Sequence, residues 1–210
     1  MCSRFEIKAK PEGLKRRFRL KRLPGAIDAA LGDAVRHPTD PVLTLTTGTN
    51  AEAEARVLRW GLAVDWDTKP LINARAETLT QKPTFRPLLT HRCLVPASAY
   101  FEWRKDKATG ARFRNRITAI DAEEEDAGLI AFAGLMDEAQ NAVTIVTCAP
   151  SPAIAHIHGR MPVILRRKDE ALWGDPNRSF AEAAPCLLPF PDVAAIEDTA
   201  PPPAQADLFG

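Results

Sequence analysis

RCLVPASAYFEW, residues 92–103, contains two β-type segments joined by a short linker of small residues. The segments, 93–95 and 100–103, are apolar, β-branched or aromatic, which favours extended backbone. Further along, RFRNRITAI at 112–120 places apolar residues between arginines, the alternation typical of a half-exposed antiparallel strand. The chain between these segments is too short for a crossover helix, so the sequence favours antiparallel pairing.

The same reasoning extends in both directions along the chain. Five more β-type segments are expected, at residues 42–46, 56–62, 129–133, 143–147 and 161–165. Three short helical segments are expected: a basic amphipathic one at 11–22, one turn at 151–158 and another at 168–173. Because strands outnumber helices and are rarely separated by crossover helices, the pattern predicts a mainly antiparallel α+β domain and not a doubly wound fold.

Length and composition predict one domain, residues 1–199, followed by a tail. The chain has 210 residues, 45% of them apolar, which is ordinary for a globular protein. From residue 200 it reads APPPAQADLFG, and three consecutive prolines predict an extended tail over residues 200–210. The acidic run at 121–126 is expected to form a solvated hairpin loop.

The sequence gives no sign of a targeting or membrane segment. Residues 1–22 are basic and lack an apolar h-region, and the apolar stretch at 129–136 is too short to span a bilayer. Four cysteines without paired spacing give neither a disulfide framework nor a zinc signature, so no metal or cofactor is expected. We therefore expect a cytoplasmic protein with reduced thiols.

Charge is distributed unevenly along the chain. Residues 1–116 carry 23 Lys and Arg against 12 Asp and Glu, whereas residues 117–210 carry 5 against 15. A basic half indicates a polyanionic partner such as nucleic acid. The alternative is that both halves intermix on one folded surface and neutralise each other.

Cys2 directly follows Met1, so removal of Met1 would expose an N-terminal cysteine. Such a residue carries an α-amine with a pKa of about 7.7–8.0 and a thiol with a pKa of about 8.5. An aldehyde can form an imine with this amine and then a five-membered thiazolidine with the sulfur. The alternative is an accidental cysteine without a role.

Four short blocks, at residues 1–5, 72–78, 92–103 and 156–163, concentrate residue types that carry chemistry. Each has a structural alternative. Glu102 could be a solvent-facing strand residue, His158 a helix C-cap, and Asn73 part of a turn.

Taken together and in order, the blocks resemble the SOS response-associated peptidase (SRAP) family, whose members shield abasic sites in single-stranded DNA. The matching residues are Met1-Cys2-Ser3-Arg4, Trp60-Gly61-Leu62 with Trp66, Asn73 to Thr78, Arg92 to Ala97 with Glu102-Trp103, Ala133-Gly134-Leu135, and Thr147 with His158 to Pro162. They span residues 1–165, most of the chain. The resemblance implies a single domain with a barrel-like, mainly antiparallel β core and a few peripheral helices.

The resemblance also implies an activity, the covalent capture of abasic sites through a thiazolidine at Cys2 during replication or SOS repair. Met1 would first leave in an autocatalytic, peptidase-type step. The Cys2 amine would then attack the aldehyde of the ring-opened deoxyribose. Glu102 is the first candidate for proton transfer, His158 would promote ring opening, and Asn73 would orient the amine. The alternatives are a peptidase or autoprotease using Cys2 with His158, and a non-catalytic single-stranded DNA binder.

Five residues are expected to contact DNA: Arg4, Trp66, Arg75, Thr147 and Arg160. Each of the three arginines lies within two residues of a proposed catalytic residue, and guanidinium groups suit phosphates. Trp66 can stack on an exposed base. The alternatives are solvated arginines and an ordinary strand threonine. Trp60, Cys93 and Cys148 are expected in the core.

The chain departs from the family pattern at several positions. Ser3 and Ala99 replace glycines, and Gly159 stands where the family commonly has Asp. Only Pro38-Thr39 remain of a Pro-Thr-Gln segment, with Asp40 in place of Gln. We expect substrate contacts within residues 23–55 to differ from those of the family.

The tail carries a separate motif. Gln205, Leu208 and Phe209 resemble the Gln-x-[Ser/Asp]-Leu-Phe peptide that docks in the bacterial sliding clamp, and a Pro-rich leader would let it reach a partner. The alternative is a sticky end without a partner. We expect a monomer associated with the bacterial nucleoid.

Overall fold

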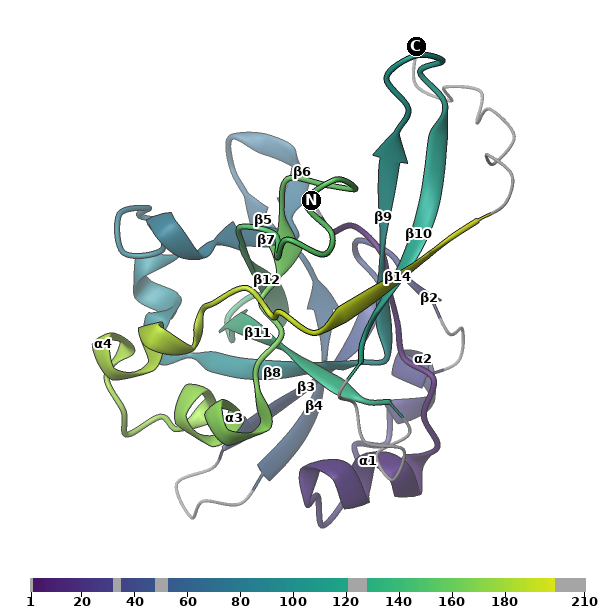
Figure 1. Ribbon diagram of the computed structural model, residues 1–210. Coiled ribbons are helices and arrows are strands. Elements are labelled where there is room, and N and C mark those ends of the chain that lie inside the picture. Colours follow the sequence, from purple (N-terminus) through teal and green to yellow (C-terminus); the bar gives the residue numbers. More distant parts are fainter. Residues whose placement is uncertain (1, 32–34, 48–52, 121–127, 199–210) are drawn as a thin grey trace.

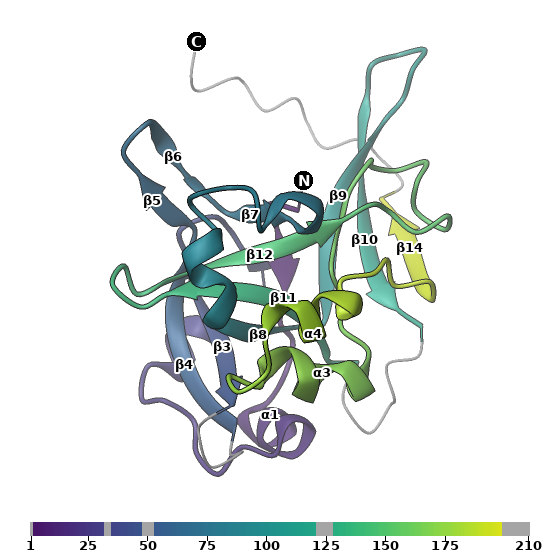
Figure 2. The ribbon, with the colours of Figure 1, turned by 90° about the vertical axis from the view of Figure 1, so that its left-hand side faces the viewer.

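A computed structural model of the chain describes residues 2–31, 35–47, 53–120 and 128–198 (Figure 1). It contains a closed barrel, a second sheet of five strands and a two-stranded hairpin. The helices lie around the periphery of the sheets (Figures 1 and 2).

The barrel closes through the strand order β11-β8-β3-β4-β12, with β12 pairing back onto β11. Its strands are β3 (Pro41–Thr47), β4 (Ala53–Trp60), β8 (Arg92–Ala97), β11 (Ile130–Asp137) and β12 (Ala142–Cys148). Neighbouring strands are antiparallel except β4 and β12, which run parallel. All residues of β12 are buried, so both of its faces are covered. Gly134 is required in this wall, because a Cβ there would stand 2.8 Å from Cys93 Sγ.

The second sheet packs against the barrel. Its order is β14 (Val193–Glu197), β10 (Arg112–Ala119), β9 (Ala99–Lys105), β1 (Phe5–Glu6) and β2 (Val35–Arg36), all antiparallel. Ser98 alone separates β8 from β9, so one stretch of chain serves both sheets. The Phe5 ring meets Trp60 and Phe132 edge-on, with ring centroids 5.0 and 5.8 Å apart.

Two short strands extend β12 at one end of the barrel. β7 (Asn73–Arg75) pairs with it in parallel and β13 (Met161–Pro162) pairs antiparallel. Before them, β5 (Leu62–Val64) and β6 (Asp67–Leu71) form a hairpin. Gly61 separates β4 from β5 at a φ of +120°, and a Cβ there would meet Pro70 at 2.8 Å.

The α-helices are α1 (Pro11–Phe18), α2 (Ile27–Leu31), α3 (Arg167–Gly174) and α4 (Phe180–Ala183). Three 3₁₀ helices cover Ala76–Thr78, Arg86–Thr90 and Ala184–Cys186. Helix α1 buries Leu14 and Phe18, one turn apart, and ends where Arg19 adopts a left-handed conformation, φ 54°. At the start of α4, Ser179 and Glu182 form a capping box.

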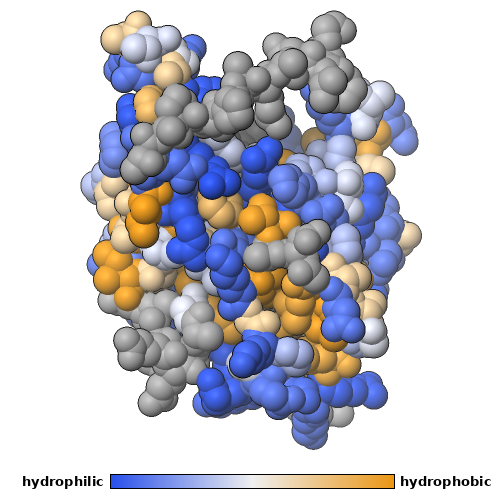
Figure 3. Space-filling model, turned by 90° about the vertical axis from the view of Figure 1, so that its right-hand side faces the viewer, coloured by the Kyte–Doolittle hydropathy of each residue, from blue (hydrophilic) through white to orange (hydrophobic). Residues whose placement is uncertain are grey.

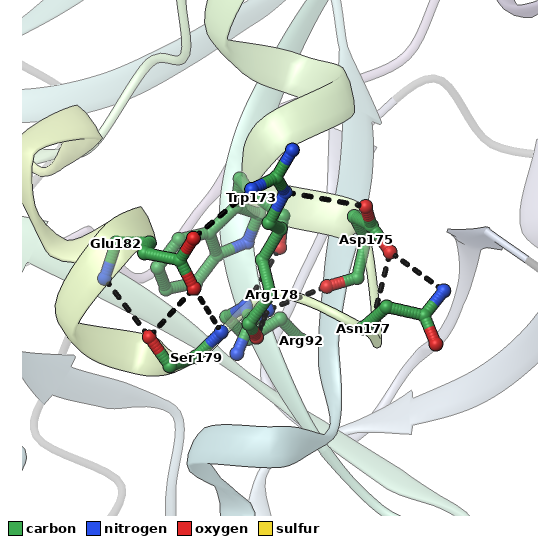
Figure 4. A network of polar contacts seen from close by, with 7 residues as sticks. All are labelled: Arg92, Trp173, Asp175, Asn177, Arg178, Ser179 and Glu182. Carbon is green, nitrogen blue, oxygen red and sulfur yellow. Dashed lines mark hydrogen bonds and ion pairs between the residues drawn. The ribbon is translucent and has the colours of Figure 1, made fainter.

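Arg92 fixes the segment from α3 to α4 to the barrel (Figure 4). Its guanidinium is buried and donates to four carbonyl oxygens, those of Leu89, Trp173, Asp175 and Arg178, at 2.6–2.8 Å. The Trp173 indole in turn donates to the Cys93 carbonyl at 3.0 Å. A planar group with five N–H donors suits this role, because it can bond several carbonyls of the segment from Trp173 to Arg178 and that of Leu89 at the same time.

Ion pairs join the basic and acidic halves of the chain. Four of the pairs between described residues join a cation of the first half to an acid of the second: Arg17–Glu170, Arg56–Glu138, Arg104–Glu197 and Arg114–Asp198. Figure 3 shows hydrophilic and hydrophobic residues intermixed on the side of β10 and β14. Part of the positive charge of the first half is therefore paired with acids of the second half.

The structure confirms the mainly antiparallel α+β fold with a barrel core. The basic helix is shorter than expected, ending at Phe18. The helical turn expected at 151–158 is a series of hydrogen-bonded turns, and the strand at 161–165 is reduced to β13 and one bridge from Ile164 to Phe132. The acidic run and the tail, residues 200–210, fall outside the described residues. No described helix is long and apolar enough to cross a membrane.

Candidate functional site

The chain segments carrying Cys2, Asn73, Glu102 and His158 converge beside β1, β7 and β9. Cys2 precedes β1, which pairs with β9, the strand of Glu102. Asn73 begins β7 and His158 precedes β13, and both strands pair with β12. These pairings bring together residues that are up to 156 positions apart in the sequence.

Cys2 is fully buried, and its main chain is held by Asn73. The Asn73 amide Nδ2 donates to the Cys2 carbonyl oxygen at 2.7 Å. The Cys2 thiol donates to the Arg4 carbonyl, with Sγ 3.6 Å from that oxygen. Burial raises the pKa of this thiol well above its usual range, and the Glu102 charge raises it further. The sulfur is therefore held as a neutral thiol in this state.

Glu102 is buried, with 3% of its surface exposed, so it is not a solvent-facing strand residue. Strand β9 pairs with β10 from Tyr100 to Lys105 and with β1 at Ala99 and Tyr100. Burial raises the pKa of the Glu102 carboxyl. Such a carboxyl keeps a proton at a higher pH than an exposed one and can donate it.

His158 lies beside Glu102, with Nδ1 3.6 Å from Glu102 Oε1. The Arg160 main-chain N–H donates to His158 Nδ1 at 3.1 Å, which orients the ring. Because residues 151–158 form no helix, His158 is not a helix C-cap.

Arg160 is tied into a network that sequence analysis did not anticipate. Its guanidinium forms two hydrogen bonds to the Glu77 carboxylate, at 2.7 and 2.9 Å. It also donates to the carbonyl and hydroxyl of Thr147, at 2.7 and 3.3 Å. The bond from Arg160 lowers the pKa of Glu77. Glu77 lies inside the Asn-Ala-Arg-x-Glu-Thr motif, so the signal for it was present in the sequence.

The other residues expected to contact DNA surround this site. The Arg4 guanidinium lies over the Trp103 ring, 5.0 Å from its centroid, and Arg75 is exposed. Trp66 is 70% exposed at the turn between β5 and β6. Figure 2 shows the β5–β6 hairpin and the long β9–β10 hairpin on either side of the N-terminus. Trp60, Cys93 and Cys148 are buried, as expected.

Two buried polar atoms near Cys2 lack a hydrogen-bond partner among the described residues. They are the Asn73 Oδ1 and the Tyr100 hydroxyl, and Tyr100 lies on the same face of β9 as Glu102. Burial raises the pKa of the Tyr100 hydroxyl well above its usual range. Orphaned polar atoms next to a nucleophile are typical of a site that completes its hydrogen bonds with a ligand.

The positions that depart from the family pattern are accommodated locally. Ala99 is buried and pairs with Glu6, and Gly159 has open space around it. Thr39 adopts a φ of 76° and donates its N–H to the Trp60 carbonyl at 2.8 Å. The described residues contain no group of three or more His, Cys, Asp or Glu that could hold a metal ion.

Comparison with known proteins agrees with this geometry. YoqW of Bacillus subtilis (strain 168), an abasic site processing protein, is 33% identical over 94% of this chain and 90% of its own length. YedK of Escherichia coli (strain K12), which has the same description, is 33% identical over 60% of this chain and 57% of its own. A crystal structure of a Bacteroides thetaiotaomicron protein superposes with a TM-score of 0.76 at 26% identity, covering 93% of this chain and 91% of that one. The family model for SOS response associated peptidase (SRAP) matches residues 1–198. The chain belongs to the SRAP family.

Proposed function

We propose that this protein captures abasic sites in single-stranded DNA by forming a thiazolidine with Cys2 after Met1 has been removed. The observation that carries the proposal is the convergence of Asn73, Glu102 and His158 on Cys2. The description of YoqW and YedK as abasic site processing proteins supports the same substrate.

In the proposed reaction Glu102 first donates a proton and later accepts one. The Cys2 amine adds to the aldehyde carbon of the ring-opened sugar, and the carbinolamine loses water to give an imine. Protonated Glu102 gives its proton to the departing hydroxyl, and the raised pKa of this carboxyl favours that form. The imine keeps the N–H proton of the carbinolamine and is therefore positively charged. The Cys2 sulfur then adds to the imine carbon, the ring nitrogen retains that proton, and the thiol proton returns to the Glu102 carboxylate. No net proton is gained or lost.

The neighbouring residues support this cycle by position. Asn73 fixes the Cys2 carbonyl and therefore the direction of the amine. His158, beside Glu102, is placed to accept the proton of the sugar hydroxyl when the ring opens. Arg4 and Arg75 supply positive charge for flanking phosphates, and the exposed Trp66 supplies a stacking surface. Arg160 would join them when its guanidinium is released from Glu77.

Denaturing gels with an abasic single-stranded oligonucleotide test the proposal. Wild type is expected to give a covalent adduct, and Cys2→Ala none without reduction. Cys2→Ala and Cys2→Ser both keep the α-amine but lack the sulfur, so an adduct of either variant should survive only after borohydride reduction of the imine. Cys93→Ala removes another buried cysteine outside the site and should leave the adduct intact.

Other outcomes would favour a different activity. An equal adduct yield from Cys2→Ala would rule out the thiazolidine. Peptide cleavage without adduct would favour a Cys2–His158 peptidase, and salt-sensitive binding with neither would favour a non-catalytic binder.

Met1 removal is the second part of the proposal. In cell-free translation with methionine aminopeptidase inhibited, intact-mass measurement should show loss of Met1 from wild type and its retention in Cys2→Ala. Retention in both proteins would assign this step to a separate enzyme.

We further propose that the protein is a monomer of the nucleoid whose tail docks on the sliding clamp through Gln205, Leu208 and Phe209. Sequence alone supports this step, since the tail lies outside the described residues. Deletion of residues 205–210 should abolish clamp binding in surface plasmon resonance without changing adduct formation. Unchanged clamp affinity would contradict it, and light scattering tests the monomer.

A further inference from the structure

The basic segment at residues 11–22 has no part in the candidate site. Figures 1 and 2 show the N-terminus towards one end of the molecule and helices α1 and α3 at the opposite end. A cavity of about 610 Å³ opens there, between the end of α1, the start of α3 and strands β3, β4 and β8. This volume lies within the range of about 300–1,000 Å³ that is typical of ligand sites.

The walls of this cavity are strongly cationic. Five of its described lining residues are cations: Arg17, Arg19, Lys21, Arg167 and Lys168. The single acid among them, Glu170, is already bonded to Arg17 at both carboxylate oxygens, and side-chain exposures of 5% and 11% bury this pair. Arg19 and Lys168 are exposed and form no ion pair with any described residue. The positive charge of Arg19 and Lys168 therefore favours an anionic ligand.

The floor of the cavity is apolar. Phe18, Leu45 and Leu94 line it, and the Arg17 guanidinium stacks on the Phe18 ring with 4.5 Å between its carbon and the centroid. An apolar floor gives no hydrogen bonds to a phosphate, so it suits a ligand that brings an apolar side chain together with its negative charge.

We propose that this cavity binds an acidic peptide segment of a partner protein, with an apolar side chain on the Phe18–Leu45–Leu94 floor and carboxylates on Arg19 and Lys168. Arginine and lysine clusters beside an apolar pocket recognise acidic motifs in this way. The ion pair and stacking of Arg17 hold that wall in place before binding, which reduces the entropy lost on association. The proposal does not depend on the chemistry at Cys2.

Fluorescence anisotropy with a labelled peptide tests the proposal. The probe has four aspartates followed by Leu-Phe, and two control peptides replace the aspartates by asparagine or Leu-Phe by Ser-Ser. The full-length protein should bind the probe and bind each control at least about tenfold more weakly. Equal binding of either control would overturn the proposal.

Variants then locate the binding. The double variant Arg19→Glu with Lys168→Glu should weaken probe binding at least about tenfold. Ala171→Trp places a large side chain in the cavity from an exposed position of α3, and it should weaken binding by a similar factor without changing the charge. The matched control, Lys82→Glu with Arg86→Glu, reverses two exposed cations outside the cavity and should bind as wild type. All of these proteins should still form the abasic-site adduct, so this proposal and that of covalent capture fail separately. Unchanged binding in both cavity variants, or displacement of the probe by intact single-stranded DNA at equal affinity, would overturn the peptide site.

Discussion

Two charged side chains, Arg92 and Glu102, are buried in one continuous stretch of chain, and their surroundings differ. Arg92 donates to four carbonyl oxygens and packs on Trp173, so its burial is compensated by fixed partners. Burial raises the pKa of Glu102, which lies near Cys2, the proposed nucleophile, and beside His158. A buried charged group whose hydrogen bonds are all made to fixed partners stabilises the fold. A buried charged group beside polar atoms that lack hydrogen-bond partners is a candidate for a chemical role.

Glu102→Gln should show the largest effect. Without a titratable proton at this position, adduct formation is expected to slow about 100-fold or more, because general acid–base catalysis contributes about 10²–10⁴. Single-turnover gels with abasic oligonucleotide measure the rate. A loss below about threefold would show that Glu102 does not carry the proton.

Glu102→Gln should slow adduct formation but make the folded protein more stable at high pH. Because burial raises the pKa of Glu102, the folded state binds this proton more tightly than the unfolded chain does. Stability therefore falls as pH rises from the unfolded carboxyl pKa, about 4.3, through the folded value. Thermal melts should show Glu102→Gln more stable than wild type at pH 8, with the difference vanishing below about pH 4. A less stable variant at pH 8 would contradict this assignment.

Arg92→Leu should have the reverse effects of Glu102→Gln: the folded protein becomes less stable, and the rate of adduct formation stays nearly unchanged. Four carbonyl oxygens lose their donor, and we expect the free energy of unfolding to fall by about 3 kcal/mol or more. Urea denaturation measures this loss. Arg92→Lys keeps the positive charge but lacks the planar guanidinium with its several N–H donors, so its free energy of unfolding should be intermediate. The adduct rate should remain near that of wild type at temperatures where the variant is folded. A loss under about 1 kcal/mol would show that the Arg92 contacts are dispensable.

Asn73→Asp tests the bond that positions Cys2. Aspartate is close to asparagine in size but cannot donate to the Cys2 carbonyl when ionised, so the adduct rate should fall about tenfold, the effect of about 1.4 kcal/mol. Binding of intact single-stranded DNA should change less than the rate does. An equal fall in both would assign Asn73 to DNA binding.

Glu77→Gln should have the smallest effect, and a favourable one. Glu77 holds the Arg160 guanidinium that would otherwise be open to a phosphate. Since an exposed ion pair contributes about 0–1 kcal/mol, releasing it should tighten binding of single-stranded DNA up to about fivefold. Glu138→Gln, which breaks the exposed pair with Arg56, makes the same charge change as a matched control. Weaker binding by Glu77→Gln alone would mean that Glu77 orients Arg160 for DNA.

The sequence alone was sufficient for most of the long strands and for drawing attention to the blocks around Cys2, Asn73, Glu102 and His158. It did not predict the short strands β1, β2, β6 and β7, nor β14. Period-2 patterns and clusters of chemically active residues are local properties, readable without a fold. Local patterns failed where tertiary contacts dominate. The segment at 151–158 has the composition of a helical turn but forms a series of turns. In this conformation His158 lies beside Glu102, and the following strand β13 pairs with β12.

Only the tertiary structure decided which buried charged residue has its hydrogen bonds satisfied by the protein and which lies in the candidate site. Arg92 and Glu102 lie within one motif of the sequence, and nothing in their neighbours along the chain distinguishes them. The difference arises from segments distant in sequence: α3 and α4 supply carbonyls to Arg92, while Cys2 and His158 approach Glu102. Burial and hydrogen bonding determine the pKa and the energetic role of a charge, and both are properties of the folded chain.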